Sequence, residues 1–220
     1  TRADERDAQN SKTGRKIVRG HTYVEGNFQI DPVWRWGVNA RRTTDDTYLR
    51  RYDISSTDNL TSNLFVEGFN GPHYASANAY AFQGLRETDD PGDTPFVLPS
   101  LEYNWTGQPD QGGDHYSFDA NVLSLYRSDG QDTLRLSLSG AWERPLITNG
   151  GSIINFSALL RGDGYHVSSM PDPSNPGSTK DGLRGRVLTQ AAVDWRLPFV
   201  RQEGSVRQVI EPVAMAILSP

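Results

Sequence analysis

The stretch "DTLRLSLSGAW", residues 132–142, alternates strictly between two kinds of side chain. One parity is apolar and consists of Leu134, Leu136, Leu138, Gly140 and Trp142. The other is polar and consists of Thr133, Arg135, Ser137 and Ser139. Because successive side chains of a strand point to opposite faces, the stretch predicts a strand with one apolar and one polar face. The alternation alone does not say which solvent each face meets.

Similar stretches recur along the chain and predict about ten strands joined by turns rich in Gly, Pro and Asp. The expected strands are 20–30, 33–42, 58–69, 73–85, 95–105, 114–127, 132–142, 152–162, 185–199 and 207–218. The alternation is ambiguous in 73–85, where alanines alternate with Tyr74, Asn78, Tyr80 and Phe82. Pro212 interrupts the last stretch. Residues 1–15 are polar and are expected to form a lead-in loop before a β-domain that spans residues 16–220.

The composition narrows the class of protein. A net charge of -5 disfavours nonspecific binding to nucleic acid. No cysteine is present, so disulfides, thiol nucleophiles and cysteine metal sites are excluded. No apolar run reaches the ~18 residues of a membrane-spanning helix. The hydrophobic content of 35% does not exclude a membrane barrel, since only alternate residues of a barrel strand face lipid.

No motif predicts an enzyme, a metal site or a cofactor site. The four histidines are scattered and form no metal-binding pair. "GDG" at 162–164 is typical of a turn. In "YLRRYDI", residues 48–54, we expect a strand with Arg50 and Arg51 on opposite faces. These arginines would bind either lipid phosphates or nearby acids at positions 45, 46 and 53, and we favour the acids because such surface ion pairs are common.

The alternation is compatible with two architectures. In a soluble secreted β-sandwich, the apolar faces would pack together, and exposed Trp and Tyr could bind carbohydrate. In an outer-membrane barrel, the apolar face would meet lipid. Tyr116 and Tyr126 share a parity ten residues apart, which is ~33 Å of strand. Tilted by about 45°, that length covers the ~25 Å between the aromatic girdles of such a barrel.

Three blocks resemble a known family: "TTDDTYLRRYDIS" at 43–55, "DNLTSNLFVEGF" at 58–69 and "PFVLPSLEYNW" at 95–105. They are similar to the outer-membrane lipopolysaccharide-assembly protein family (LptD, also called organic-solvent-tolerance protein) in its alphaproteobacterial type. "GLRGRVLTQAAVDWRLPFV" at 182–200 and "VRQVIEPVAMAILSP" at 206–220 also look like the barrel of that family. The resemblance covers most of residues 15–220.

The resemblance implies an all-β, antiparallel transmembrane β-barrel wall in the outer membrane of a Gram-negative bacterium. It implies transport of lipopolysaccharide to the outer leaflet, with lipopolysaccharide and membrane lipids as ligands. The implied protein partners are an LptE-like plug lipoprotein and the periplasmic bridge proteins for lipopolysaccharide. The family's paired cysteines and jelly-roll domain have no counterpart here. About ten strands are too few for its barrel, so we expect a partial barrel segment whose edges continue into other strands.

On this interpretation, the apolar parity faces lipid and the polar parity lines the lumen. An arginine at position 136 should then be costly, and one at position 137 should be tolerated. The predicted lumen-lining residues are Arg35, Asn39, Arg41, His115, Asp119, Asn121, Arg135, Ser137, Arg161, Arg186, Gln190 and Asp194.

Overall fold

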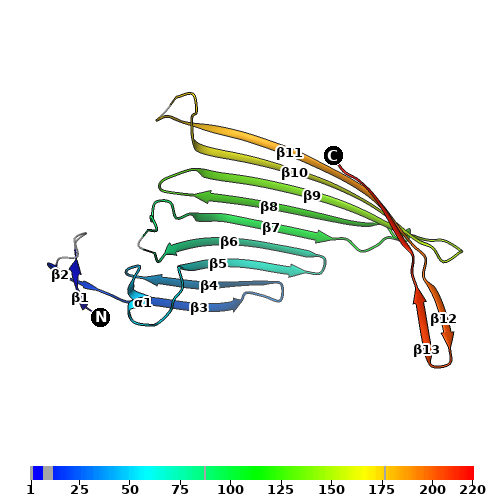
Figure 1. Cartoon of the computed structure of the whole chain (residues 1–220), viewed down its shortest axis with the longest axis horizontal. Coiled ribbons are helices and arrows are strands. Elements are labelled where there is room, and N and C mark those ends of the chain that lie inside the picture. The colour runs from blue at the N-terminus through cyan, green and yellow to red at the C-terminus, as the bar shows by residue number, and fades with distance from the viewer. Residues whose placement is uncertain (1, 7–11, 87, 176) are drawn as a thin grey trace.

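The computed structural model describes residues 2–6, 12–86, 88–175 and 177–220. Ten strands of this part of the chain form one antiparallel sheet (Figure 1). They are β3 (His21–Gln29), β4 (Trp34–Thr43), β5 (Asn59–Asn70), β6 (His73–Gly84), β7 (Phe96–Thr106), β8 (His115–Tyr126), β9 (Asp132–Ile147), β10 (Ile153–Pro171), β11 (Thr179–Arg196) and β14 (Val213–Leu218). Each of the ten predicted stretches contributes a strand to this sheet.

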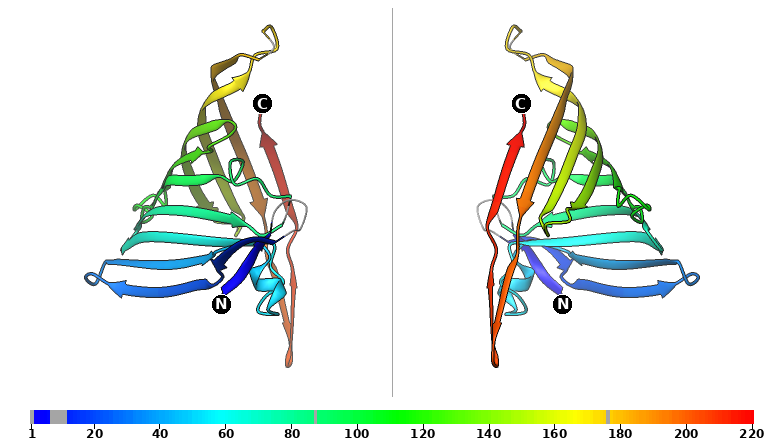
Figure 2. Two further views of the ribbon diagram at one scale, coloured as in Figure 1. Left: turned by 90° about the vertical axis from the view of Figure 1, so that its left-hand side faces the viewer. Right: turned by 90° about the vertical axis from the view of Figure 1, so that its right-hand side faces the viewer.

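The strands lie side by side in the order of the chain, from β3 at one edge to β11, which then pairs with β14 at the other edge. This meander is typical of antiparallel strands, because consecutive ones can be joined by a few residues, as at residues 71–72 between β5 and β6. β3 and β14 lie at opposite edges and do not pair with each other, so the sheet is open. Figure 2 shows that it is strongly twisted.

The last predicted strand is divided at Pro212, which cannot donate to a ladder because it has no N–H group. Residues before it form β13 (Val206–Ile210), which pairs with β12 (Phe199–Glu203) in a separate hairpin. Residues after it form β14, which pairs with β11. In Figure 1 the β12–β13 hairpin extends away from the large sheet.

Residues 1–15 are not simply the loop that the sequence predicted. β1 (Arg2–Arg6) and β2 (Lys12–Val18) pair antiparallel in a two-stranded sheet, with Arg2 opposite Val18. The physical reason is that backbone pairing does not depend on apolar side chains, so polar composition alone did not reveal these strands. Residues 1 and 7–11 lie outside the described residues. The expected boundary at residues 15/16 falls within β2, and the division into a lead-in and a barrel segment stays a prediction.

The stretch predicted as a strand around Arg50 and Arg51 is a short helix, α1 (Tyr48–Arg51). Its Leu49 is 1% exposed and forms a buried apolar cluster with Tyr48, Leu60 and Leu85. Packing of Tyr48 and Leu49 into this cluster accounts for the helical turn, because tertiary contacts readily override local strand propensity. No helix in the described residues is long and apolar enough to cross a membrane.

The register keeps apolar and polar residues on opposite faces across nine adjacent strands. One row of directly opposite residues consists of Phe28, Trp36, Val66, Ala77, Leu101, Val122, Leu136, Gly164 and Gly185. The next position along each strand gives Gln29, Arg35, Glu67, Ser76, Glu102, Asn121, Ser137, Asp163 and Arg186. We call the face with the first row the apolar face and the face with the second row the polar face. The register also assigns the alanines of β6 to the apolar face.

Candidate functional site on the polar face

The polar face holds all of the candidate residues that the sequence indicated. By register they share this face: Arg35, Asn39, Arg41, His115, Asp119, Asn121, Arg135, Ser137, Arg161, Arg186, Gln190 and Asp194. Whether this face lines a lumen stays a prediction. The structure brings some of these residues into one cluster and leaves others in separate pairs.

Four candidates converge on the carboxylate of Asp163, which is fully buried as a side chain. The Ser137 hydroxyl donates to it at 2.5 Å, Arg186 Nε donates at 2.7 Å, and Arg161 Nη2 donates at 3.2 Å. Arg135 Nη2 lies 3.6 Å from the same carboxylate and its guanidinium lies over the ring of Tyr165. These contacts join β9, β10 and β11 into what we call the Asp163 cluster.

The sequence interpretation missed Asp163 because it assigned "GDG" to a turn. That assignment is wrong, since residues 162–164 lie within β10, opposite β9 on one side and β11 on the other. The two glycines belong to the apolar face and the aspartate belongs to the polar face. A buried carboxylate costs free energy unless it is paired and hydrogen-bonded, and the serine and arginine donors meet that need. The parity of Asp163 with Arg161 was the signal that could have identified it.

Residues on the other half of the polar face form simple pairs. Arg35 Nε lies 2.7 Å from Glu67 Oε1, and Tyr74 donates to Glu67 Oε2 at 3.1 Å. Here one cation meets one carboxylate. Further contacts of candidate residues are Arg41 to Asn39 at 3.1 Å, Asn104 to Asp119 at 2.6 Å, and Asn121 to the carbonyl of Leu101 at 3.1 Å.

Three candidates lie apart from both groups. His115 stands opposite Glu143, and Gln190 stands opposite Leu159. Asp194 is 3.9 Å from Arg196 on its own strand. In the residues that the structure describes, no group of three or more His, Asp or Glu is arranged to hold a metal ion.

A separate ion-pair cluster joins the loops beside α1. Asp58 accepts hydrogen bonds from Arg50 and from Arg86, the latter at 2.6 Å. Arg50 therefore pairs with an acid, as we favoured, but with Asp58 rather than with the acids at 45, 46 or 53. The hydrogen bond from Arg86, with a further contribution from Arg50, holds the pKa of Asp58 below its ordinary value.

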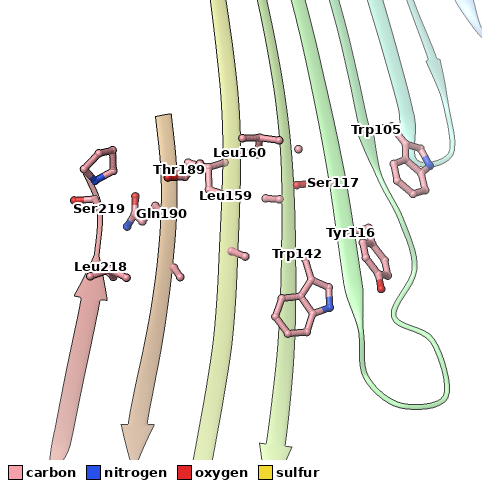
Figure 3. Close-up of a pocket in the computed structure, with 15 residues that line it drawn as sticks. Trp105, Tyr116, Ser117, Trp142, Leu159, Leu160, Thr189, Gln190, Leu218 and Ser219 are labelled. Carbon is pink, nitrogen blue, oxygen red and sulfur yellow. The ribbon is translucent and has the colours of Figure 1, made fainter. Parts of the chain in front are cut away.

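The apolar face contains a shallow groove of about 860 Å³. Trp105, Tyr116 and Trp142 line one side of it, and residues of β10, β11 and β14, among them Leu160 and Leu218, line the other (Figure 3). The indole N–H of Trp142 donates to Asp114 at 2.8 Å, in the turn before β8. Aromatic rings with a polar anchor thus lie near one end of the apolar face. Most of the residues that line the groove belong to the apolar face, and of the candidate residues only Gln190 lines it.

These observations define an all-β protein whose one large antiparallel sheet separates an apolar face from a polar one. The chain matches the family described as LPS transport system D (LptD) over residues 18–220. It therefore belongs to the LptD family. The family resemblance noted in the sequence is confirmed, while the alphaproteobacterial type stays a prediction.

Individual relatives agree with this assignment. The chain is 27% identical to the LPS-assembly protein LptD of Shigella boydii serotype 4 over 213 residues, which is 90% of this chain and 26% of the relative. It is 27% identical to the LPS-assembly protein LptD of Escherichia coli strain K12 over 206 residues, which is 87% of this chain and 25% of the relative. The chain thus spans about a quarter of the length of the relatives it matches.

Proposed function

We propose that this chain forms part of the wall of an outer-membrane β-barrel that carries lipopolysaccharide to the outer leaflet. The apolar face meets lipid acyl chains, and the polar face borders the interior through which hydrophilic parts of lipopolysaccharide pass. The chain acts by containment and not as an enzyme. Its partners are lipopolysaccharide, membrane lipids, an LptE-like plug lipoprotein and the periplasmic bridge proteins for lipopolysaccharide.

The observation that supports this proposal most strongly is the separation of the two faces in a member of the LptD family. Leu134, Leu136 and Leu138 are 45%, 46% and 42% exposed. Leaving large apolar side chains in contact with water costs roughly 25 cal/mol per Å² of exposed apolar surface. In a membrane barrel, lipid covers the apolar face and removes that cost, while the polar face stays in contact with water.

The open sheet also fits a wall that is continued by other strands. Backbone groups at an unpaired edge cost several kcal/mol each in lipid, on the order expected for lost hydrogen bonds in an apolar medium. The edges at β3 and β14 would therefore pair with further strands in the membrane.

The alternative of a soluble carbohydrate-binding β-sandwich gains no support from the architecture. A sandwich requires a second sheet that packs over the apolar face. In the described part of the chain, the large sheet is accompanied by two sheets of two strands each. The leucines of β9 are exposed instead of being packed between layers.

Fluorescence quenching tests the orientation of the faces. Leu136→Cys and Ser139→Cys are introduced singly into the full-length protein, from which other cysteines have been removed, and each is labelled with a fluorophore in proteoliposomes. We expect the label at 136 to be quenched by lipids with brominated acyl chains and the label at 139 to be quenched by aqueous iodide. Iodide quenching of equal strength at both positions would contradict the barrel wall.

Depletion tests the transport role. Lowering the amount of the full-length protein in its bacterium should reduce the lipopolysaccharide that an impermeant probe detects at the cell surface. Re-expression from a plasmid should restore it. Unchanged surface lipopolysaccharide after depletion would refute the proposed transport.

A further inference from the structure

The Asp163 cluster lies within a three-by-three array of residues on the polar face. β9 contributes Arg135, Ser137 and Ser139, and β10 contributes Tyr165, Asp163 and Arg161 directly opposite them. β11 completes the array with Arg184, Arg186 and Leu188. Asp163 is the central residue, and four arginines lie around it. At about 4.8 Å between strands and about 3.3 Å per residue, the array measures roughly 10 Å by 13 Å.

Charge in this array is not balanced. Four arginines share the array with one carboxylate, and three of them, Arg135, Arg161 and Arg186, lie within 3.6 Å of it, so a net charge of +3 is concentrated there. The whole chain has a net charge of -5, which makes the excess of cations local. Elsewhere on the same face, Arg35 meets Glu67 one to one. A buried carboxylate is satisfied by one or two cations, so the need to pair Asp163 does not explain four arginines.

The arginines are oriented by Asp163 yet reachable from solvent. The side chains of Arg161 and Arg186 are 37% and 55% exposed, whereas that of Asp163 is fully buried. Each guanidinium has five N–H donors in a planar fork, of which Asp163 receives one or two from each of these two residues. Because the fork matches the oxygens of a phosphate, such an arrangement is suited to bidentate hydrogen bonding of phosphate groups.

We propose that Arg135, Arg161 and Arg186, held in place by Asp163, form with the neighbouring Arg184 a binding seat for the phosphate groups of a glycolipid that passes along the polar face. The proposal rests on the proposed function, since it takes lipopolysaccharide as the ligand and the polar face as its path. Asp163 acts as a positioning residue, because it fixes the guanidinium groups and prevents their mutual repulsion from spreading them apart.

A binding measurement tests the seat. Labelled lipopolysaccharide and lipopolysaccharide from which the phosphates have been removed are titrated against the full-length protein in detergent. We expect the phosphorylated form to bind about tenfold more tightly, which is the scale of one charge-assisted hydrogen bond. Arg161→Gln with Arg186→Gln should reduce this preference to less than about twofold, as both forks are lost.

A matched pair of variants controls for charge. Arg201→Gln with Arg207→Gln removes the same two charges from the β12–β13 hairpin, outside the large sheet, and should keep the full preference. Arg184 lies one row away from Asp163. Arg184→Gln should lower the preference for the phosphorylated form about threefold, as expected for the loss of one exposed charge. This variant keeps the test decisive if the double variant fails to fold.

Three outcomes would overturn the seat. These are an unchanged preference in both Arg184→Gln and the double variant, an equal loss in the hairpin control, and binding of inorganic phosphate by the wild type without any preference for the phosphorylated lipopolysaccharide. The last would assign the array to free phosphate. Surface delivery of lipopolysaccharide is measured in parallel. If the wild type delivers lipopolysaccharide to the surface but shows no preference for the phosphorylated form, only the proposed seat is refuted. If it does not deliver lipopolysaccharide, the proposed function is refuted.

Discussion

Ser137 on β9 and Asp163 on β10 stand directly opposite each other, and the serine hydroxyl donates a 2.5 Å hydrogen bond to the aspartate carboxylate. Ser137 is 7% exposed and Asp163 is 3% exposed. The pair therefore joins two neighbouring strands at a point where a charged group is withdrawn from water. This revises the expectation that an arginine at 137 would be tolerated, because a larger side chain would displace the donor and enter a filled site.

Ser137→Ala should destabilise the folded protein by about 1–2 kcal/mol, since the buried carboxylate loses a donor that water cannot easily replace. The free energy of unfolding, from urea titrations of the full-length protein in lipid vesicles, provides the measurement. Ser139→Ala, two residues along the same face, serves as the control and should change it by less than about 0.5 kcal/mol. An equal decrease in the free energy of unfolding in both variants would show that the hydrogen bond from Ser137 to Asp163 does not stabilise the protein.

Leu136→Arg should cost ~2–4 kcal/mol if the apolar face meets the middle of a bilayer. Ser157→Arg is the matched control, since it places the same side chain on the polar face directly opposite Glu143. We expect a low folded yield of Leu136→Arg in liposomes and a yield of Ser157→Arg close to that of the wild type. Similar yields for both variants would argue against lipid on the apolar face.

The ion pairs of Asp58 should make the loops beside α1 sensitive to acid. Because the folded pKa of Asp58 lies below its unfolded value, its contribution to stability is complete above the unfolded pKa of about 3.9 and is lost as the pH falls through the folded pKa. The difference in urea midpoint between the wild type and Asp58→Asn should thus be constant above about pH 5 and shrink as the pH falls below the unfolded pKa of about 3.9. A difference that grows on acidification would contradict the ion-pair assignment.

Two glycines on the apolar face should respond in opposite ways to alanine. A Cβ at Gly68 would lie 2.6 Å from the Trp34 ring, whereas a Cβ at Gly162 would meet nothing within 4 Å. Gly68→Ala should destabilise the protein by about 1–3 kcal/mol through overpacking. Gly162→Ala should stabilise it by about 0.4–1 kcal/mol, since alanine reduces the freedom of the unfolded chain. Unfolding midpoints of the two variants check the contrast, and a shift of the same sign in both would refute it.

The alternation in 132–142 was sufficient to predict β9 and the separation of its faces, because side-chain parity in a strand is fixed by backbone geometry. In contrast, the same reasoning placed Arg50 and Arg51 in a strand. In that segment the burial of Leu49 against Leu60 and Leu85, which are distant in sequence, favours a helix. The end of β10 was also missed, because "GDG" has turn composition and its pairing with both neighbours is visible only in three dimensions.

The sequence by itself determined the ten strands of the large sheet and the parity of side chains in the strands with clear alternation, since both depend on neighbours within a few residues. Only the tertiary structure decided the register that brings Arg135, Arg161 and Arg186 around Asp163. Register depends on which residues of separate strands stand opposite each other, and a slip of one residue would move a whole strand's side chains to the other face. The buried carboxylate, and the excess of arginines around it, exist only once β9, β10 and β11 are aligned.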